Sequence, residues 1–167
     1  VRITPHCAFG AGHHETTSMM IAALLEAQAS GIFEQPRKVL DMGCGTGVLG
    51  IMAKKCGAAM VVAVDIDDKS VKNSLENAEA NDVVMDVRLG STPPDGEYDL
   101  ILANIHRNIL VEHMPAYARG LSPAGEVWMS GFYADDIPHL AAAAEKVGLQ
   151  VAETRKLGEW NWIRLTR

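Results

Sequence analysis

Three glycines alternate with other residues in Asp41-Met42-Gly43-Cys44-Gly45-Thr46-Gly47, between a short apolar run and a helical pattern. The apolar run at 38–42 is typical of a buried strand, and Val48–Cys56 has helical spacing and ends before Gly57. Glycines at such a junction let the chain turn sharply and let a ligand approach the backbone, beside the free N–H groups of the helix. A plain tight turn is the weaker interpretation.

Two cofactor patterns fit this loop. Residues 45–50 satisfy the dinucleotide pattern G-x-G-x-x-G, and Asp65 lies near the spacing expected of an acid on a ribose. The other frame, acid-x-G-x-G-x-G, begins at Asp41. A carboxylate there would stand beside the pyrophosphate of NAD, whereas it suits a cofactor with an ammonium group and no phosphate. The loop therefore favours S-adenosylmethionine, with NAD as the alternative.

Strand and helix patterns alternate along the rest of the chain. Apolar runs predict strands at 60–64, 83–89, 98–103 and 126–130, and helical spacing predicts helices at 16–31, 69–80, 108–119 and 137–147. Asp67 or Asp68 is expected to cap the helix at 69–80. The last strands, 150–156 and 162–166, have no helix between them and should form an antiparallel hairpin at one edge. The pattern predicts an α/β, doubly wound, mostly parallel sheet.

Composition limits the classes of protein that remain. The chain has 167 residues, 48% of them hydrophobic and 22% charged, which is typical of one globular domain. Its longest apolar run, 58–64, is too short for a membrane span. A net charge of −6 disfavours binding to nucleic acid or anionic membranes. The cysteines Cys7, Cys44 and Cys56 follow no ligand spacing and indicate reduced thiols in the cytoplasm.

A segment rich in small residues and histidines precedes the first predicted helix. It reads Ala8-Phe9-Gly10-Ala11-Gly12-His13-His14-Glu15-Thr16-Thr17, and Thr16 or Thr17 is a candidate helix cap. The His13-His14 pair beside Glu15 suggests a metal, but no third spaced ligand stands out and H-E-x-x-H is absent. No metal site is therefore predicted.

The glycine frame resembles motif I of the class I S-adenosylmethionine-dependent methyltransferases. The preceding segment is similar to the A-F-G-T-G-x-H-x-T-T of the PrmA-type ribosomal protein methyltransferases, which modify amino groups of a large-subunit ribosomal protein. Further similarities are Ala103-Asn104-Ile105, Ser130-Gly131 and Glu159-Trp160, so the resemblance runs from about Pro5 to the end. Ala11 and His6 depart from the family's threonine and glycine. The resemblance implies a seven-stranded sheet of order 3-2-1-4-5-7-6 with the last strand antiparallel.

The resemblance also implies roles for individual residues. Asp65 would take the ribose hydroxyls, Ile66 would lie against adenine, and Asn104 would accept a hydrogen bond from the substrate amine. His14 would lie near the methyl-transfer centre. The expected cofactor-binding residues are Thr17, Asp41, Gly43, Gly45, Gly47, Asp65, Ile66 and Asn104, and the expected catalytic residues are Asn104 and His14. Asp41 is expected to act by orienting backbone N–H groups of the loop.

Residues 1–17 are then a cofactor-closing arm and 18–167 a catalytic domain. The family's N-terminal substrate-recognition domain has no counterpart here, so a catalytic-domain fragment is expected. The implied activity is S-adenosylmethionine-dependent N-methylation of lysine or α-amino groups of a basic ribosomal protein. Alternatives are methylation of another protein or of a small-molecule amine, an NAD-dependent oxidoreductase, and a non-catalytic adaptor, against which the intact glycines, Asp65 and Asn104 argue.

Overall fold

The computed structural model describes residues 1–5 and 14–167, and for His14 the backbone only. The strands are β1 (Lys38–Met42), β2 (Met60–Asp65), β3 (Asp86–Leu89), β4 (Tyr98–Asn104), β5 (Leu121–Tyr133), β6 (Gln150–Leu157) and β7 (Trp160–Thr166). The helices are α1 (His14–Ala29), α2 (Val48–Cys56), α3 (Asp68–Ala80), α4 (Arg107–Gly120) and α5 (Ile137–Glu145), with the short 3-10 turns η1 (Ile32–Glu34) and η2 (Ala134–Asp136).

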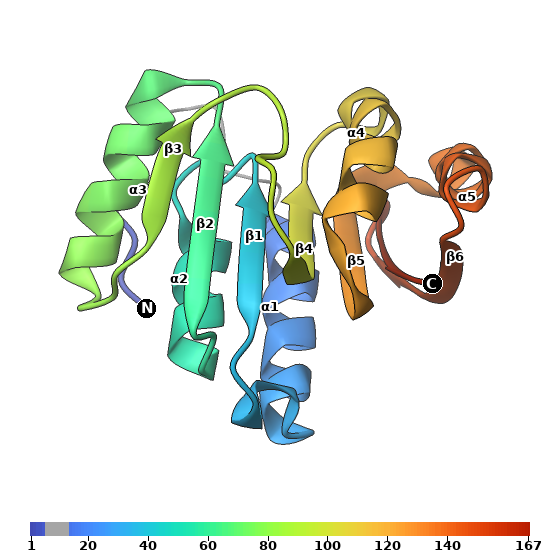
Figure 1. Cartoon of the computed structure of the whole chain (residues 1–167). Coiled ribbons are helices and arrows are strands. Elements are labelled where there is room, and N and C mark those ends of the chain that lie inside the picture. The colour runs from blue at the N-terminus through green and yellow to red at the C-terminus, as the bar shows by residue number, and fades with distance from the viewer. Residues whose placement is uncertain (6–13) are drawn as a thin grey trace.

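The strands form one seven-stranded sheet of order β3-β2-β1-β4-β5-β7-β6 (Figure 1). Neighbouring strands from β3 to β5 are parallel, and β7 runs antiparallel to both β5 and β6. The predicted fold class and strand order are therefore confirmed. The chain reverses its direction of winding between β1 and β4, and ligands of doubly wound sheets bind at that point, outside the carboxyl ends of the strands.

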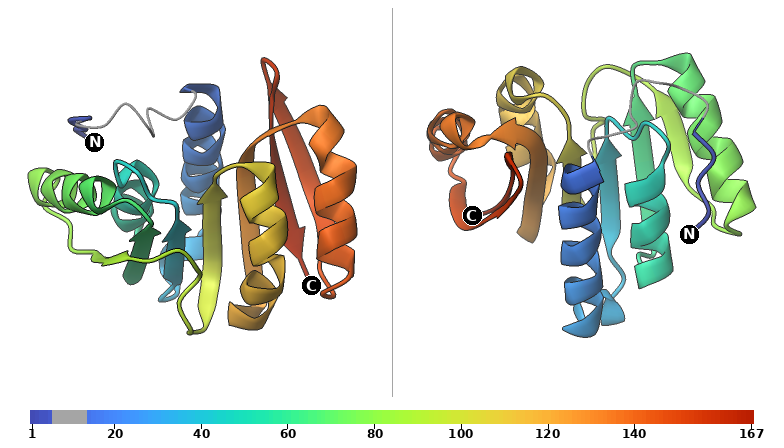
Figure 2. Two further views of the ribbon diagram at one scale, coloured as in Figure 1. Left: turned by 90° about the horizontal axis from the view of Figure 1, so that it is seen from above. Right: turned by 180° about the vertical axis from the view of Figure 1, so that it is seen from behind.

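Helices cover both faces of the sheet, with α1, α2 and α3 on one face and α4 and α5 on the other (Figure 2). Each face has its own apolar core because successive strand residues point to opposite sides. In β1, Val39 packs into the cluster shared with α1 and α2, whereas Leu40 packs into the cluster shared with α4 and α5. None of the helices in the described part of the chain combines the length and apolar character needed to cross a membrane.

Two strands differ from their predicted boundaries, and one predicted helix cap is confirmed. The strand predicted from Val83 begins at Asp86, and Val84 is exposed, so this apolar run is not a sign of burial. The strand predicted at 126–130 extends over Leu121–Tyr133, and its pairing with β4 is irregular between Leu121 and Glu126. Asp67, one of the two predicted caps, accepts a hydrogen bond from the backbone of Lys69 at the start of α3.

Candidate functional site

Parallel strands bring the predicted site residues to one edge of the sheet. The glycine loop follows β1, Asp65 ends β2, and Asn104 ends β4, directly beside its partner Ser130 in β5. The carboxyl ends of these strands lie at the same edge (Figure 1). Residues that are far apart in the sequence therefore meet at the point where the winding reverses.

The glycine loop adopts backbone conformations that side chains disfavour. Gly43, Gly45 and Gly47 have φ angles of 74°, 53° and 78°, in the left-handed region that glycine enters without steric cost. A Cβ on Gly43 would also collide with the side chain of Ile105, which follows β4. A Cβ on Gly47 would lie 3.0 Å from the Ser74 hydroxyl of α3. The glycines thus allow the loop to lie close to both β4 and α3.

Asp65 holds the loop from the end of β2. Its Oδ2 accepts a hydrogen bond from Gly45 N at 2.9 Å, and its Oδ1 accepts one from Asp67 N at 2.9 Å. Each carboxylate oxygen has two lone pairs, so this arrangement leaves acceptor capacity for further donors such as ribose hydroxyls. Ile66, the next residue, is 75% exposed. An exposed apolar side chain beside a partly buried carboxylate matches the two ends of an adenosine.

Asp41 lies beneath the loop. Its side chain is buried, and its Oδ2 accepts a hydrogen bond from Gly50 N at 2.8 Å. A Cβ added at Gly50 would lie 3.1 Å from that oxygen, so a glycine allows this close contact. Burial raises the pKa of Asp41 from its ordinary value to about 7, although the bond from Gly50 opposes this shift. Asp41 therefore holds a backbone N–H of the first turn of α2, next to the loop, and its expected role in orienting N–H groups of the loop stays a prediction.

The same contacts bear on the choice between the two cofactor frames. A pyrophosphate on the N-terminus of α2 would use the free N–H groups of the first turn. Two of these groups already have partners, because Gly47 N donates to Cys44 O at 2.7 Å and Gly50 N donates to Asp41. The geometry therefore favours a cofactor without a pyrophosphate.

Replacing Asp41 with asparagine should flatten the pH dependence of stability. Between about pH 4 and pH 7 the folded protein keeps a proton on Asp41 that the unfolded chain has released, because the folded pKa is raised. The free energy of unfolding of the unaltered chain should therefore fall as the pH rises through this window, by on the order of 1 kcal/mol per pH unit more than that of Asp41→Asn. Urea unfolding at a series of pH values measures this difference, and parallel profiles would contradict it.

Asn104 and Thr17 face each other from β4 and the first turn of α1. Asn104 Nδ2 lies 3.5 Å from Thr17 Oγ1, a contact between residues 87 positions apart. When the amide nitrogen points to Thr17, the amide oxygen is free to accept from another donor. Two expected site residues are thus brought together. The side chain of His14 lies outside the described residues, as do residues 6–13, so its expected role stays a prediction.

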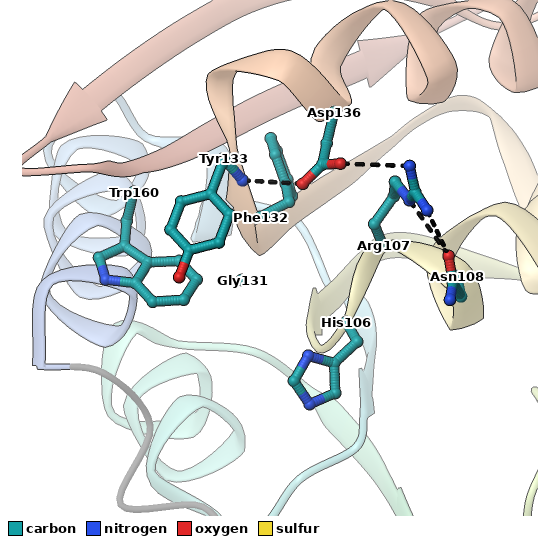
Figure 3. Close-up of a pocket in the computed structure, with 8 residues that line it drawn as sticks. All are labelled: His106, Arg107, Asn108, Gly131, Phe132, Tyr133, Asp136 and Trp160. Atoms are coloured by element: carbon teal, nitrogen blue, oxygen red, sulfur yellow. Dashed lines mark hydrogen bonds and ion pairs between the residues drawn. The ribbon is translucent and has the colours of Figure 1, made fainter.

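A hollow of about 440 Å³ opens beside the end of β4 (Figure 3). Its lining comes from the start of α4, the end of β5, η2 and the start of β7: His106, Arg107, Asn108, Gly131, Phe132, Tyr133, Asp136 and Trp160. Arg107 and Asp136 form an ion pair at 3.4 Å. The rings of Tyr133 and Trp160 stack, with centroids 4.5 Å apart and planes 27° apart. The hollow therefore combines an aromatic wall with a paired charge.

Sequence reasoning missed most of this hollow. Gly131 and Trp160 belong to two of the short motifs that resemble the family, but the sequence alone does not connect them to His106 or to each other. The link is the antiparallel strand β7, which returns along β5 and pairs Trp160 with Tyr133. Within residues 1–5 and 14–167, no group of three or more His, Cys, Asp and Glu side chains is arranged to hold a metal.

Gly131 fixes the contact between the ends of β4 and β5. Its φ is +96°, and a Cβ there would lie 2.8 Å from the backbone oxygen of Ile105. Gly131→Ala should therefore displace the end of β4, because the obstacle is backbone. Gly148→Ala is the matched control, since Gly148 has φ +78° and nothing within 4 Å of an added Cβ.

Both variants bear the cost of a left-handed alanine, about 1 kcal/mol. Gly131→Ala should lower the free energy of unfolding by at least about 1 kcal/mol more than Gly148→Ala. Urea unfolding of the two variants makes the comparison, and equal losses would show that the collision is unimportant.

The family model described as ribosomal protein L11 methyltransferase (PrmA) matches residues 1–167. A ribosomal protein L11 methyltransferase of Porphyromonas gingivalis is 48% identical over 168 residues, which cover 98% of this chain and 56% of that protein. One of Bacteroides thetaiotaomicron is 42% identical over 98% of this chain and 58% of that protein. The chain thus spans somewhat more than half the length of these relatives.

Solved structures agree with this result. The crystal structure of a ribosomal protein L11 methylase from Lactobacillus delbrueckii subsp. bulgaricus matches with a TM-score of 0.86 and 31% identity, over 93% of this chain and 80% of that one. A TehB-like SAM-dependent methyltransferase from Corynebacterium glutamicum shares the fold with a TM-score of 0.67 and 20% identity, over 89% and 87% of the two chains. The family resemblance is confirmed, and the chain belongs to the ribosomal protein L11 methyltransferase (PrmA) family.

Proposed function

We propose that the chain binds S-adenosylmethionine at the carboxyl edge of the sheet and transfers its methyl group to an amine. The observation that carries the proposal is the pairing of the glycine loop with Asp65, whose Oδ2 accepts from Gly45 N at 2.9 Å. The loop gives close access to backbone, Asp65 retains lone pairs for the ribose, and exposed Ile66 offers an apolar face to adenine. Family membership supports the same cofactor.

The bound cofactor would supply an electrophilic methyl group on a sulfonium, whose carbon–sulfur bond breaks as the amine nitrogen bonds to the methyl carbon, so that S-adenosylhomocysteine leaves as a neutral thioether. The chain's own residues align the acceptor and favour its neutral form, because an amine is protonated near pH 7 and its lone pair is needed for attack. Asn104 accepts a hydrogen bond from the neutral amine and directs its lone pair, while Thr17 orients the amide. His14 is proposed as the second catalytic residue near the transfer centre.

The hollow beside β4 is proposed as the entrance for the acceptor. A volume of about 440 Å³ accommodates an extended side chain, and the stacked rings of Tyr133 and Trp160 supply the faces on which a lysine stem and its cationic end pack. The relatives are named for ribosomal protein L11, so amino groups of that protein are the proposed acceptors. Another protein or a small-molecule amine is the alternative.

Two parts of the chain have separate proposed roles. Residues 18–167 form the catalytic unit, and residues 1–17 form an arm that closes on the cofactor. The partner is a basic ribosomal protein rather than nucleic acid or membrane, which the net charge of −6 supports. The proposed location is the cytoplasm, because a ribosomal protein substrate is found there.

Labelled methyl transfer tests the activity. This chain, and separately a full-length relative such as the Porphyromonas gingivalis protein, is incubated with methyl-labelled S-adenosylmethionine and unmodified ribosomal proteins. The proposal expects binding of the cofactor by both proteins, and label in the protein named L11 with both. Label confined to other proteins or to small amines would overturn the acceptor, and no label with either chain would overturn the activity.

A further inference from the structure

The face of α3 that turns toward the rest of the molecule is mostly polar, with Ala78 as its apolar member. Helices usually bury an apolar stripe, yet Ser70, Asn73, Ser74 and Asn77 are all at most 5% exposed, and Asn81 just beyond the helix is 7% exposed. Buried amides and hydroxyls need hydrogen-bond partners. Ser70 donates to the Asp67 carboxylate, and the partners of the other four are backbone groups of two other segments, residues 2–4 and the glycine loop.

Three asparagines hold residues 2–4. Asn73 Nδ2 donates to Thr4 O at 2.8 Å, and Asn77 and Asn81 each pair with a peptide unit as a neighbouring strand would. Asn81 Oδ1 accepts from Arg2 N at 2.7 Å, and its Nδ2 donates to Arg2 O at 2.6 Å. Asn77 Oδ1 accepts from Thr4 N at 2.9 Å, and its Nδ2 lies 3.4 Å from Thr4 O. A side-chain amide carries the same donor and acceptor as a peptide group, which makes this double pairing possible.

The spacing of the two pairs explains why they coexist. Residues four apart on a helix are about 6 Å apart along its axis, and residues two apart in an extended chain are about 6.6 Å apart. Asn77 and Asn81 therefore match Thr4 and Arg2. Between them, Ile3 packs against the apolar cluster under α1 and α2. The N-terminal segment runs along α3 in both Figure 1 and Figure 2.

The same row of side chains holds the glycine loop. Asn77 Nδ2 donates to Thr46 O at 2.9 Å, and Ser74 Oγ donates to Gly45 O at 2.9 Å. Gly45 is also the residue whose N–H meets Asp65. One amide, that of Asn77, thus contacts both Thr4 and the loop, and it is 2% exposed. If Thr4 leaves, the Oδ1 of Asn77 loses the hydrogen bond from Thr4 N, and a buried amide rotates to find another partner.

We propose that Asn77 is a positioning residue that couples the docking of residues 2–4 on α3 to cofactor binding by the glycine loop. The docked segment holds the Asn77 amide in the orientation that supports Thr46, and the supported loop presents Gly45 and Asp65 to the cofactor. Docking and cofactor binding therefore strengthen each other by the same factor, as linkage requires. The inference rests on the proposed function, because it assumes that the loop binds an S-adenosyl cofactor.

Thr4→Pro tests the coupling without altering α3 or the loop. Proline lacks the N–H that donates to Asn77 and fits extended chain. The affinity of the Thr4→Pro variant for S-adenosylhomocysteine, measured by calorimetry, should be weaker than that of the unaltered chain by about fivefold or more. Arg2→Pro removes the bond to Asn81 and should act in the same direction. Thr4→Ala is the matched control, since it keeps the N–H and removes only an exposed side chain.

A second readout separates coupling from a merely structural contribution. Amide hydrogen exchange at Thr4 in the unaltered chain should slow when S-adenosylhomocysteine is added, by a factor similar to the affinity change. Equal affinities for Thr4→Pro and Thr4→Ala, with exchange at Thr4 independent of the ligand, would overturn the inference alone. Failure of the unaltered chain to bind S-adenosylhomocysteine would overturn the proposed function and the inference together.

Discussion

Asp65→Ala is expected to abolish binding of S-adenosylhomocysteine while the domain stays folded. The substitution removes the carboxylate that would accept from both ribose hydroxyls, and hydrogen bonds to a charged group contribute about 1.5–3 kcal/mol each. It also releases Gly45 N and Asp67 N, which both donate to this carboxylate at 2.9 Å. Together these losses correspond to a decrease in affinity of at least about a hundredfold, measurable by calorimetry.

Asp67→Ala is the matched control for Asp65. Asp67 is an acid two residues along the chain, and its side chain caps α3 by accepting from Lys69 N. Its loss should lower the free energy of unfolding by about 1 kcal/mol and leave cofactor affinity near that of the unaltered chain. Retained binding in Asp65→Ala, or equal weakening in both variants, would contradict the assignment of Asp65 to the ribose.

Asn104→Ala is expected to spare cofactor binding and to remove methyl transfer. Asn104 lies at the end of β4, between the glycine loop and the hollow that opens at His106. Without its amide the amine has no acceptor to orient its lone pair, and misalignment of a reacting group costs about 10²-fold or more in rate. Single-turnover transfer of labelled methyl to unmodified ribosomal proteins measures the rate, and calorimetry on the same sample measures binding.

Thr17 provides a pair of variants that separates orientation from contact. Thr17→Val removes the hydroxyl 3.5 Å from Asn104 Nδ2 and keeps the shape of the side chain, whereas Thr17→Ser keeps the hydroxyl. Transfer should fall in Thr17→Val and be restored in Thr17→Ser. Normal turnover in Asn104→Ala would count against the role of Asn104, whatever the result for Thr17.

Local patterns predicted the elements that build the site. The glycine loop follows a buried strand, and Asp65 and Asn104 are the last residues of two others. The ends of such strands can be predicted because the apolar runs stop there. The order of the strands came from a resemblance rather than from local patterns. The cap at Asp67 was foreseen because it depends only on the first turn of α3.

Contacts between segments that are distant in the chain could not be predicted from the sequence patterns. Asp41 was expected to orient the loop, but its partner Gly50 and its raised pKa depend on how closely α2 packs on β1. The hollow is built from segments on α4, β5 and β7. The pairing of Thr4 with Asn77 joins residues 73 positions apart. Such contacts depend on tertiary packing, which periodicity does not encode.

A parallel titration of the chain with S-adenosylhomocysteine and with NADH tests the central claim most directly. The two candidate frames of the glycine loop differ in whether the cofactor carries a pyrophosphate, and Asp41 and Cys44 already occupy two N–H groups that a pyrophosphate would use. Calorimetry should show one site for S-adenosylhomocysteine and no saturable binding of NADH. Saturable binding of NADH without binding of S-adenosylhomocysteine would contradict the account.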